Sequence, residues 1–122
     1  DRQAFLKQFD VAGQGIGFAV LGGVFGEGVD LPGKRLIGAF VATLGLPQFD
    51  AVNQAICERM EARFGRGHDY TYVFPGMQKV VQAAGRVIRS ETDTGSVLLL
   101  DARYGERRYR SLLPDWWNIE MA

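Results

Sequence analysis

Apolar residues occur along this chain in two patterns, as short continuous runs and as stripes at helical spacing. The continuous runs are Phe18–Leu21, Leu36–Leu44 and Ser96–Asp101. Unbroken apolar runs are typical of strands that are buried on both faces of a parallel sheet. Each run therefore predicts a buried strand.

Stripes with three- and four-residue spacing predict helices between these strands. One stripe stops at Gly65 and consists of Phe49, Val52, Ile56, Met60 and Phe64. A second lies within Pro75–Ser90, with proline at the first turn, and consists of Met77, Val80, Val81, Ala84, Val87 and Ile88. Shorter helices are expected at Arg2–Phe9 and Arg103–Leu113, and Tyr70–Val73 is expected to be extended.

Strands that alternate with helices predict an α/β fold, in which helices flank a parallel sheet. Residues 1–122 are expected to form one domain or a piece of one. Three strands are few for such a sheet, and the chain begins with Asp1. We therefore expect part of the sheet to lie upstream of this chain.

Composition excludes several function classes. Hydrophobic residues make up 47% and charged residues 23%, as in globular proteins, and the formal net charge is +0. With no overall basic field, any contact with nucleic acid must be local. Cys57 is the single cysteine, so we expect no metal site within the chain and a reducing, cytoplasmic location. No apolar run is long enough to predict a membrane span, and no signal peptide or membrane partner is expected.

The polar side of the second predicted helix carries the first candidate chemistry. Gln82, Gly85, Arg86 and Arg89 fall opposite the apolar stripe, at positions i, i+3, i+4 and i+7. A guanidinium is always charged, and its planar fork matches phosphate oxygens. The plain alternative is an amphipathic helix with solvated arginines.

A glycine-rich stretch, Gly22–Gly33, follows the first predicted strand. Ligands of parallel α/β folds bind at the carboxyl ends of strands, and glycine lets backbone amides approach a phosphate closely. The stretch matches neither a nucleotide P-loop nor a dinucleotide-binding fingerprint. A plain turn remains the alternative.

Taken in order, these segments resemble the DinG/XPD-type branch of superfamily 2 DNA helicases. Gly23–Gly33 resembles motif V of that branch, and Gln82-x-x-Gly85-Arg86-x-x-Arg89 resembles motif VI, the arginine-finger motif. The remaining matches occur in the same order as in that branch: Leu44–Pro47, Ser90-x-x-Asp93-x-Gly95, the run ending at Asp101 with Arg103-Tyr104 after it, and Leu113-Pro114-x-Trp116.

The resemblance implies a partial RecA-like domain, the second motor domain of an ATP-dependent DNA helicase with its N-terminal part missing. ATP and Mg²⁺ would be bound mainly by the first motor domain of the same polypeptide, and the substrate would be single-stranded or forked DNA. Arg86 and Arg89 would be the catalytic finger pair, with Gln82 as a nearby polar contact. The implied nucleotide-contacting or coupling residues are Gly26, Glu27, Gly28, Asp30 and Gly85.

The chain also departs from the family's pattern. It lacks a Walker A sequence, an acidic metal motif and the four-cysteine cluster of many members, all of which belong to the first motor domain. An iron–sulfur cluster is therefore possible only outside this chain, and the chain alone is expected to be inactive. Gly26 stands where many relatives have serine, which puts a hydroxyl contact to DNA in doubt.

Two alternatives from other classes stay open. The first is a non-catalytic α/β module that binds nucleotide or protein through a degenerate motor surface. The second concerns the basic residues Arg103, Arg107, Arg108 and Arg110. They form either a solvated face paired with Glu106 or a strip that binds DNA.

Overall fold

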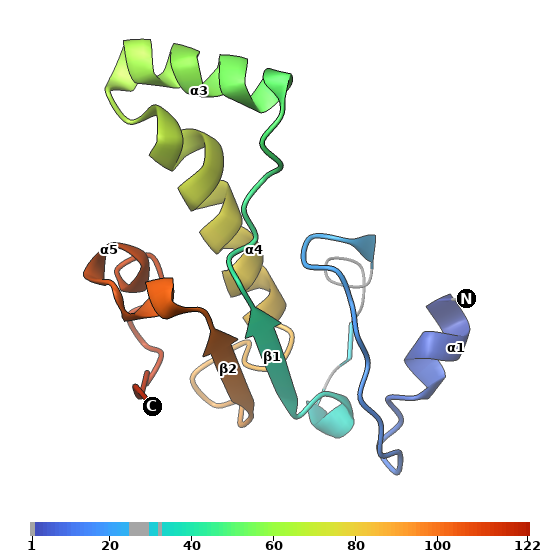
Figure 1. The fold of residues 1–122 in the computed structure, drawn as a ribbon. Coiled ribbons are helices and arrows are strands. Elements are labelled where there is room, and N and C mark those ends of the chain that lie inside the picture. The colour runs from blue at the N-terminus through green and yellow to red at the C-terminus, as the bar shows by residue number, and fades with distance from the viewer. Residues whose placement is uncertain (1, 25–29, 32) are drawn as a thin grey trace.

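The computed structural model describes residues 2–24, 30–31 and 33–122 (Figure 1). The first half contains helix α1, a 3₁₀ turn η1, strand β1 and helix α3: Arg2–Lys7, Gly33–Arg35, Gly38–Ala42 and Ala51–Phe64. The second half contains a π-helical turn η2, helix α4, strand β2, a 3₁₀ turn η3 and helix α5: Asp69–Val73, Phe74–Ala84, Ser96–Leu100, Ala102–Gly105 and Arg107–Arg110.

In the described part of the chain, β1 and β2 form a two-stranded parallel sheet. Gly38 pairs with Ser96 at one end and Ala42 pairs with Leu100 at the other. The connection between the strands contains α3, η2 and α4, as a parallel crossover requires. This arrangement confirms the predicted α/β class.

The core lies between α4 and one face of the sheet. Met77 and Val80 of α4 are almost fully buried and meet Val41 of β1. The C-terminal segment adds further side chains to this core. The buried residues of the core are Val41, Leu44, Val73, Met77, Val80, Tyr104, Tyr109 and Leu113.

The helix α3 ends at Gly65, as the sequence predicts, and begins after Asp50. The side chain of Asp50 accepts a hydrogen bond from the backbone N–H of Asn53 at its start, at 2.8 Å. Gly65 ends the helix in the left-handed conformation, with φ of 69°. Its apolar stripe is not covered, however, and α3 buries no residue. Figure 1 shows why, since α3 crosses the far end of α4, away from the sheet.

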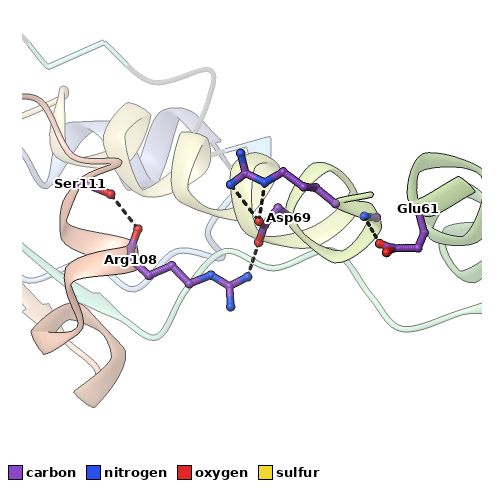
Figure 2. A network of polar contacts seen from close by, with 6 residues as sticks. Glu61, Asp69, Arg108 and Ser111 are labelled. Carbon is purple, nitrogen blue, oxygen red and sulfur yellow. Dashed lines mark hydrogen bonds and ion pairs between the residues drawn. The ribbon is translucent and has the colours of Figure 1, made fainter. Parts of the chain in front are cut away.

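A group of ion pairs centred on Asp69, called the ion-pair hub below, joins the segment between α3 and α4 to the C-terminal segment (Figure 2). The carboxylate of Asp69 accepts hydrogen bonds from Arg66 and from Arg108 of α5. Burial opposes ionisation of Asp69, but the two guanidiniums outweigh burial and lower its pKa. The hub therefore joins η2 to α5 across 39 positions of sequence.

A second cluster lies where the two strands end. Asp101 accepts hydrogen bonds from the backbone N–H of Arg103 at 3.0 Å and from its guanidinium at 2.8 and 2.9 Å. The same guanidinium donates to Thr43 Oγ1, and the Tyr104 hydroxyl donates to the Thr43 carbonyl at 2.9 Å. These bonds hold Thr43 at φ of 69°, a left-handed conformation that a β-branched residue rarely adopts.

This cluster predicts an acid-sensitive term in stability. The hydrogen bonds from the Arg103 side chain and backbone hold the pKa of Asp101 well below its ordinary value. A lowered folded-state pKa contributes stability above the unfolded pKa of about 4, and that stability is lost as pH falls further. We expect Asp101→Asn to cost about 1 kcal/mol at neutral pH and to flatten the loss of stability below about pH 4. Urea unfolding measured across this pH range checks the expectation.

The control for this experiment is Asp115→Asn, which replaces an exposed carboxylate outside the cluster. It should leave the acid limb as in the wild type. An acid limb that is equally steep in Asp101→Asn and the wild type would contradict the assignment of this term to Asp101.

Several predicted elements differ from the structure. Phe18–Leu21 has no strand assignment, and Phe18 is 91% exposed. A strand needs a neighbour for its backbone groups, and no strand pairs with this segment in the described residues. Tyr70–Val73 is helical because it continues directly into α4, with Tyr72 and Val73 buried. Propensity for extended structure is overridden here by tertiary packing.

The third error concerns the end of the arginine helix. Helix α4 stops at Ala84, so the predicted Pro75–Ser90 helix is too long by its last turns. Proline lies in the first turn of α4, but Pro75 does not open the helix as predicted, because helical structure already begins upstream and continues through η2 into α4. The C-terminal helix is also shorter than predicted, since Arg103–Leu113 divides into η3 and α5.

The strand β2 is present but not buried on both faces. The faces of the sheet differ, because Val41 faces α4 whereas Phe40, its neighbour in β1, is 71% exposed. Leu98 and Leu100 of β2 share the face of Phe40 by register, and both are exposed. One face of this sheet is therefore apolar and uncovered.

Candidate nucleotide-contact site

The candidate site begins where α4 ends. The N–H of Gly85 donates to the Val81 carbonyl at 2.9 Å, and the N–H of Arg86 donates to the Ala83 carbonyl at 3.1 Å. The change to shorter hydrogen-bond spacing closes the helix in a turn. Val87 is buried in this turn and anchors it to the core. Arg86 and Arg89 therefore extend from a turn rather than from a helix face.

Sequence-predicted residues meet in one open cleft. Its volume is about 700 Å³, and its lining residues are Asp30, Gln82, Gly85, Arg86 and Arg89. All five were predicted as site residues, and they come from segments more than fifty positions apart in sequence. The structure thus brings Asp30 close to Gln82, Gly85, Arg86 and Arg89.

Within the cleft, Arg89 forms an ion pair with Asp30. The side chains are 40% and 68% exposed, respectively. An ion pair this exposed contributes little to stability, typically about 0–1 kcal/mol. The guanidinium of Arg89 is therefore held in place by a partner that another anion could replace at small cost.

Three predicted site residues lie outside the described residues: Gly26, Glu27 and Gly28. The described flanks of the glycine-rich stretch are placed against α4 and the core. Gly22 has φ of 79°, and a Cβ at this position would come within 3.0 Å of the Lys79 side chain. Leu31 is buried beside Asp30 in sequence. One described flank of the stretch therefore lies beside α4, and the other includes a buried leucine.

The location of the cleft differs from the expected carboxyl edge of the sheet. Gly95, which follows the arginine turn, approaches Ile37, and these two residues immediately precede β2 and β1. The cleft therefore lies beside the amino ends of the strands. The expectation was wrong because it relied on a strand at Phe18–Leu21, which the structure does not form.

The chemistry of the cleft suits an anion. Two guanidiniums and the Gln82 amide supply hydrogen-bond donors, and Gly85 lines the cleft without a side chain. Planar guanidinium forks match phosphate oxygens better than a point charge does. In the described residues, no group of three or more His, Cys, Asp or Glu side chains could hold a metal ion.

Two of the four basic residues of the C-terminal strip are engaged in ion pairs. Arg103 pairs with Asp101 and Arg108 pairs with Asp69. Pairing was the plainer of the two interpretations, although the partners are these aspartates rather than Glu106. Two cations of the strip are therefore already neutralised, which weakens the case for a DNA-binding strip.

Sequence reasoning named Asp93 only as part of the family match and gave it no role in the site. Its carboxylate accepts a hydrogen bond from the backbone N–H of Arg89 at 2.8 Å. An aspartate three or four positions after such a turn often accepts bonds from backbone amides, so the spacing of Ser90 and Asp93 could have signalled it.

Comparison with known proteins decides the family. The sequence profile of the helicase C-terminal domain family matches residues 1–120. The chain belongs to this family. In the described residues, no helix is long and apolar enough to cross a membrane.

Individual relatives of this helicase C-terminal domain agree with the DinG/XPD-type resemblance. The chain is 38% identical over 95 residues to an ATP-dependent DNA helicase DinG of Photobacterium profundum, covering 76% of this chain and 14% of that protein. It is 31% identical over 106 residues to the XPD helicase subunit of general transcription and DNA repair factor IIH of Arabidopsis thaliana, covering 81% and 13%. Against the ATP-dependent DNA helicase chl1 of Schizosaccharomyces pombe it is 27% identical over 122 residues, covering 92% and 14%. The chain thus spans about one seventh of the length of these relatives.

Proposed function

We propose that this chain is part of an ATP-dependent DNA helicase and supplies the second motor domain's contribution to ATP hydrolysis. The observation that carries the proposal is the cleft in which Arg86, Arg89, Gln82 and Asp30 meet. The family assignment and the names of the relatives support a helicase role. A first RecA-like domain of the same polypeptide would hold ATP and Mg²⁺.

The roles of the residues follow from phosphoryl-transfer chemistry. Bound ATP supplies the γ-phosphoryl group, whose oxygens carry charge that redistributes during transfer. Arg89 and Arg86 place two positive charges at the open side of the cleft, where they stabilise that charge in the transition state. Gln82 adds a neutral donor beside them. Gly85 leaves room for the partner domain to approach.

Asp30 is proposed to couple nucleotide binding to the DNA track. The exposed Arg89–Asp30 pair means that Arg89 has a carboxylate partner before it meets a phosphate. When Arg89 turns to the phosphate, Asp30 loses its cation, and motif V is free to rearrange. Glu27, Gly26 and Gly28 belong to the same proposal through the resemblance of motif V, with DNA in single-stranded or forked form as the substrate.

The uncovered sheet face supports the domain assignment. Phe40, Leu98 and Leu100 form an exposed apolar surface on one side of β1 and β2. Parallel sheets are normally covered on both faces. We propose that residues 1–122 are part of a larger RecA-like domain whose further elements cover this face.

A non-catalytic module with a degenerate motor surface is the second candidate. The sequence and activity of the longer polypeptide in which the chain occurs distinguish the two candidates. The helicase proposal requires a Walker A sequence and an acidic metal motif in that polypeptide, and DNA-stimulated ATP hydrolysis by it. A polypeptide without either motif would favour the non-catalytic module.

The 122-residue chain alone is expected to hydrolyse ATP at the background rate. It contains no Walker A lysine, and its arginines stabilise charge on a nucleotide that another domain must hold. Phosphate release with and without single-stranded DNA measures this. Turnover by the isolated chain that is abolished in Arg89→Ala would show a complete active site within it and contradict the proposal.

A further inference from the structure

The loop that carries both arginines, residues 85–95, is fixed first by close packing. Val87 is buried, and Gly95 returns directly over it. A Cβ at Gly95 would lie 2.4 Å from Val87 Cγ1, so a side chain at this position would displace the loop. Packing at Val87 therefore fixes the loop between its two arginines and at its return to β2.

The second fixed point is the carboxylate of Asp93. One of its oxygens, Oδ2, accepts hydrogen bonds from the backbone N–H of Arg89 at 2.8 Å and of Ser90 at 3.0 Å. The Ser90 hydroxyl donates to the same oxygen at 3.4 Å, and the N–H of Asp93 donates to the Ser90 carbonyl at 3.1 Å. Asp93 thus accepts hydrogen bonds from two backbone amides beyond the end of α4, and one of them belongs to Arg89.

We propose that Asp93 is a positioning residue for Arg89, one that sets where the guanidinium can reach. Asp93 does not line the arginine cleft, and its hydrogen bonds to Arg89 are to the backbone rather than to the guanidinium. A charge-assisted bond from backbone N–H to carboxylate is stronger than a neutral one, and here a single carboxylate oxygen serves adjacent amides. The inference rests on the proposed function, in which Arg89 acts as an arginine finger.

Position matters because a finger residue acts only within a narrow range of geometry. Groups that stabilise a transition state must be held within about 0.5 Å of the productive position. Arginine has a long, flexible side chain, and the exposed pair with Asp30 constrains it weakly. The position of the Arg89 guanidinium therefore depends on the Arg89 backbone, which Asp93 holds in place.

The test compares Asp93→Ala and Asp93→Asn in the full-length polypeptide, using DNA-stimulated ATP hydrolysis. Loss of the acceptor should lower kcat by about 10–100-fold and change the KM for ATP by less than about 3-fold, because Arg89 contributes in the transition state. Asparagine keeps an acceptor oxygen, so Asp93→Asn should retain kcat within about 5-fold of wild type. Glu91→Ala, an exposed carboxylate removed from the same loop, is the matched control and should behave as wild type.

Two further readouts separate positioning from general damage. The double variant Asp93→Ala with Arg89→Ala should be no slower than Arg89→Ala alone, because Asp93 acts through Arg89. Hydrogen exchange of a peptide spanning residues 86–95 should be faster in Asp93→Ala than in the wild type and unchanged elsewhere. Additive losses in the double variant, or an Asp93→Asn variant as slow as Asp93→Ala, would overturn the proposal.

The outcomes also distinguish this inference from the proposed function. If Arg89→Ala turns over at the wild-type rate, Arg89 is not a finger, and the proposed function is what fails. Exchange at residues 86–95 then decides on Asp93 alone. Faster exchange in Asp93→Ala would show that it holds the loop, whereas unchanged exchange would show that it does not.

Discussion

Replacing Arg89 by alanine is expected to lower DNA-stimulated ATP hydrolysis of the full-length polypeptide by about 1,000-fold. Arginine fingers contribute factors of about 10³–10⁵ to kcat in phosphoryl transfer, and Arg86 in the same cleft would retain part of the effect. The KM for ATP should change by less than about 3-fold, since the main nucleotide contacts lie in another domain. Steady-state phosphate release at saturating DNA measures both constants.

Two variants sharpen this experiment. Arg89→Lys keeps the charge but loses the planar fork, so its kcat should fall between those of Arg89→Ala and the wild type. Arg59→Ala removes an exposed arginine of α3 outside the cleft and should leave hydrolysis unchanged. Near-wild-type turnover by Arg89→Ala would refute the finger assignment. Equal losses in Arg89→Ala and Arg59→Ala would point to non-specific damage instead.

The contacts of Arg89 in the structure support this prediction. Its guanidinium pairs with Asp30, while its backbone is held by Asp93. The first contact is exposed and replaceable, and the second is part of the loop's own turn. A finger needs this combination, because the charged end must change partners while the base of the side chain stays in place.

Patterns in the sequence predicted the elements whose cause is local. The end of α3 could be read from Gly65, because a left-handed glycine acts within one turn. The buried stripe of α4 could be read from Met77 and Val80. The resemblance grouped Asp30 with the arginine row as expected site residues, and these residues line one cleft in the structure.

Features with a non-local cause could not be predicted in this way. Phe18–Leu21 has the composition of a strand, but a strand forms only beside a partner. Tyr70–Val73 has the composition of a strand too, and it becomes helical because α4 continues through it and buries it. The apolar stripe beyond Ala84 also continues the helical spacing, so it gave no sign that the helix stops there. Val87 still reaches the core from the turn.

The last prediction concerns Gly67, which lies between α3 and η2. We expect Gly67→Ala to destabilise the chain by about 2 kcal/mol. A Cβ at Gly67 would lie 2.2 Å from the Cys57 carbonyl oxygen and 2.9 Å from both the backbone nitrogen and Cβ of Glu61. Two of these atoms belong to the backbone of α3, so the helix as a whole would have to move. Overpacking of this kind costs about 1–3 kcal/mol and sometimes more.

The same substitution also has a smaller, stabilising effect on helix propensity. Gly67 is helical and does not have a positive φ, so alanine would gain about 1 kcal/mol of helix propensity there. Displacement of α3 would also weaken the bond from the Gly67 N–H to the Glu61 carboxylate, now 2.6 Å long. With a contact at 2.2 Å against backbone, we expect a cost of about 3 kcal/mol to outweigh the gain. A net loss of about 2 kcal/mol corresponds to a melting temperature lower by roughly 8 °C for a chain of this size.

Thermal unfolding followed by far-ultraviolet circular dichroism tests this expectation, with Gly105→Ala as the matched glycine control. A Cβ at Gly105 would meet only Met121 Cε, at 3.5 Å, which is ordinary van der Waals contact. Gly105→Ala should therefore leave the melting temperature unchanged or raise it slightly, because alanine restricts the unfolded chain. A Gly67→Ala chain as stable as the Gly105→Ala chain would show that Gly67 does not pack this closely against α3.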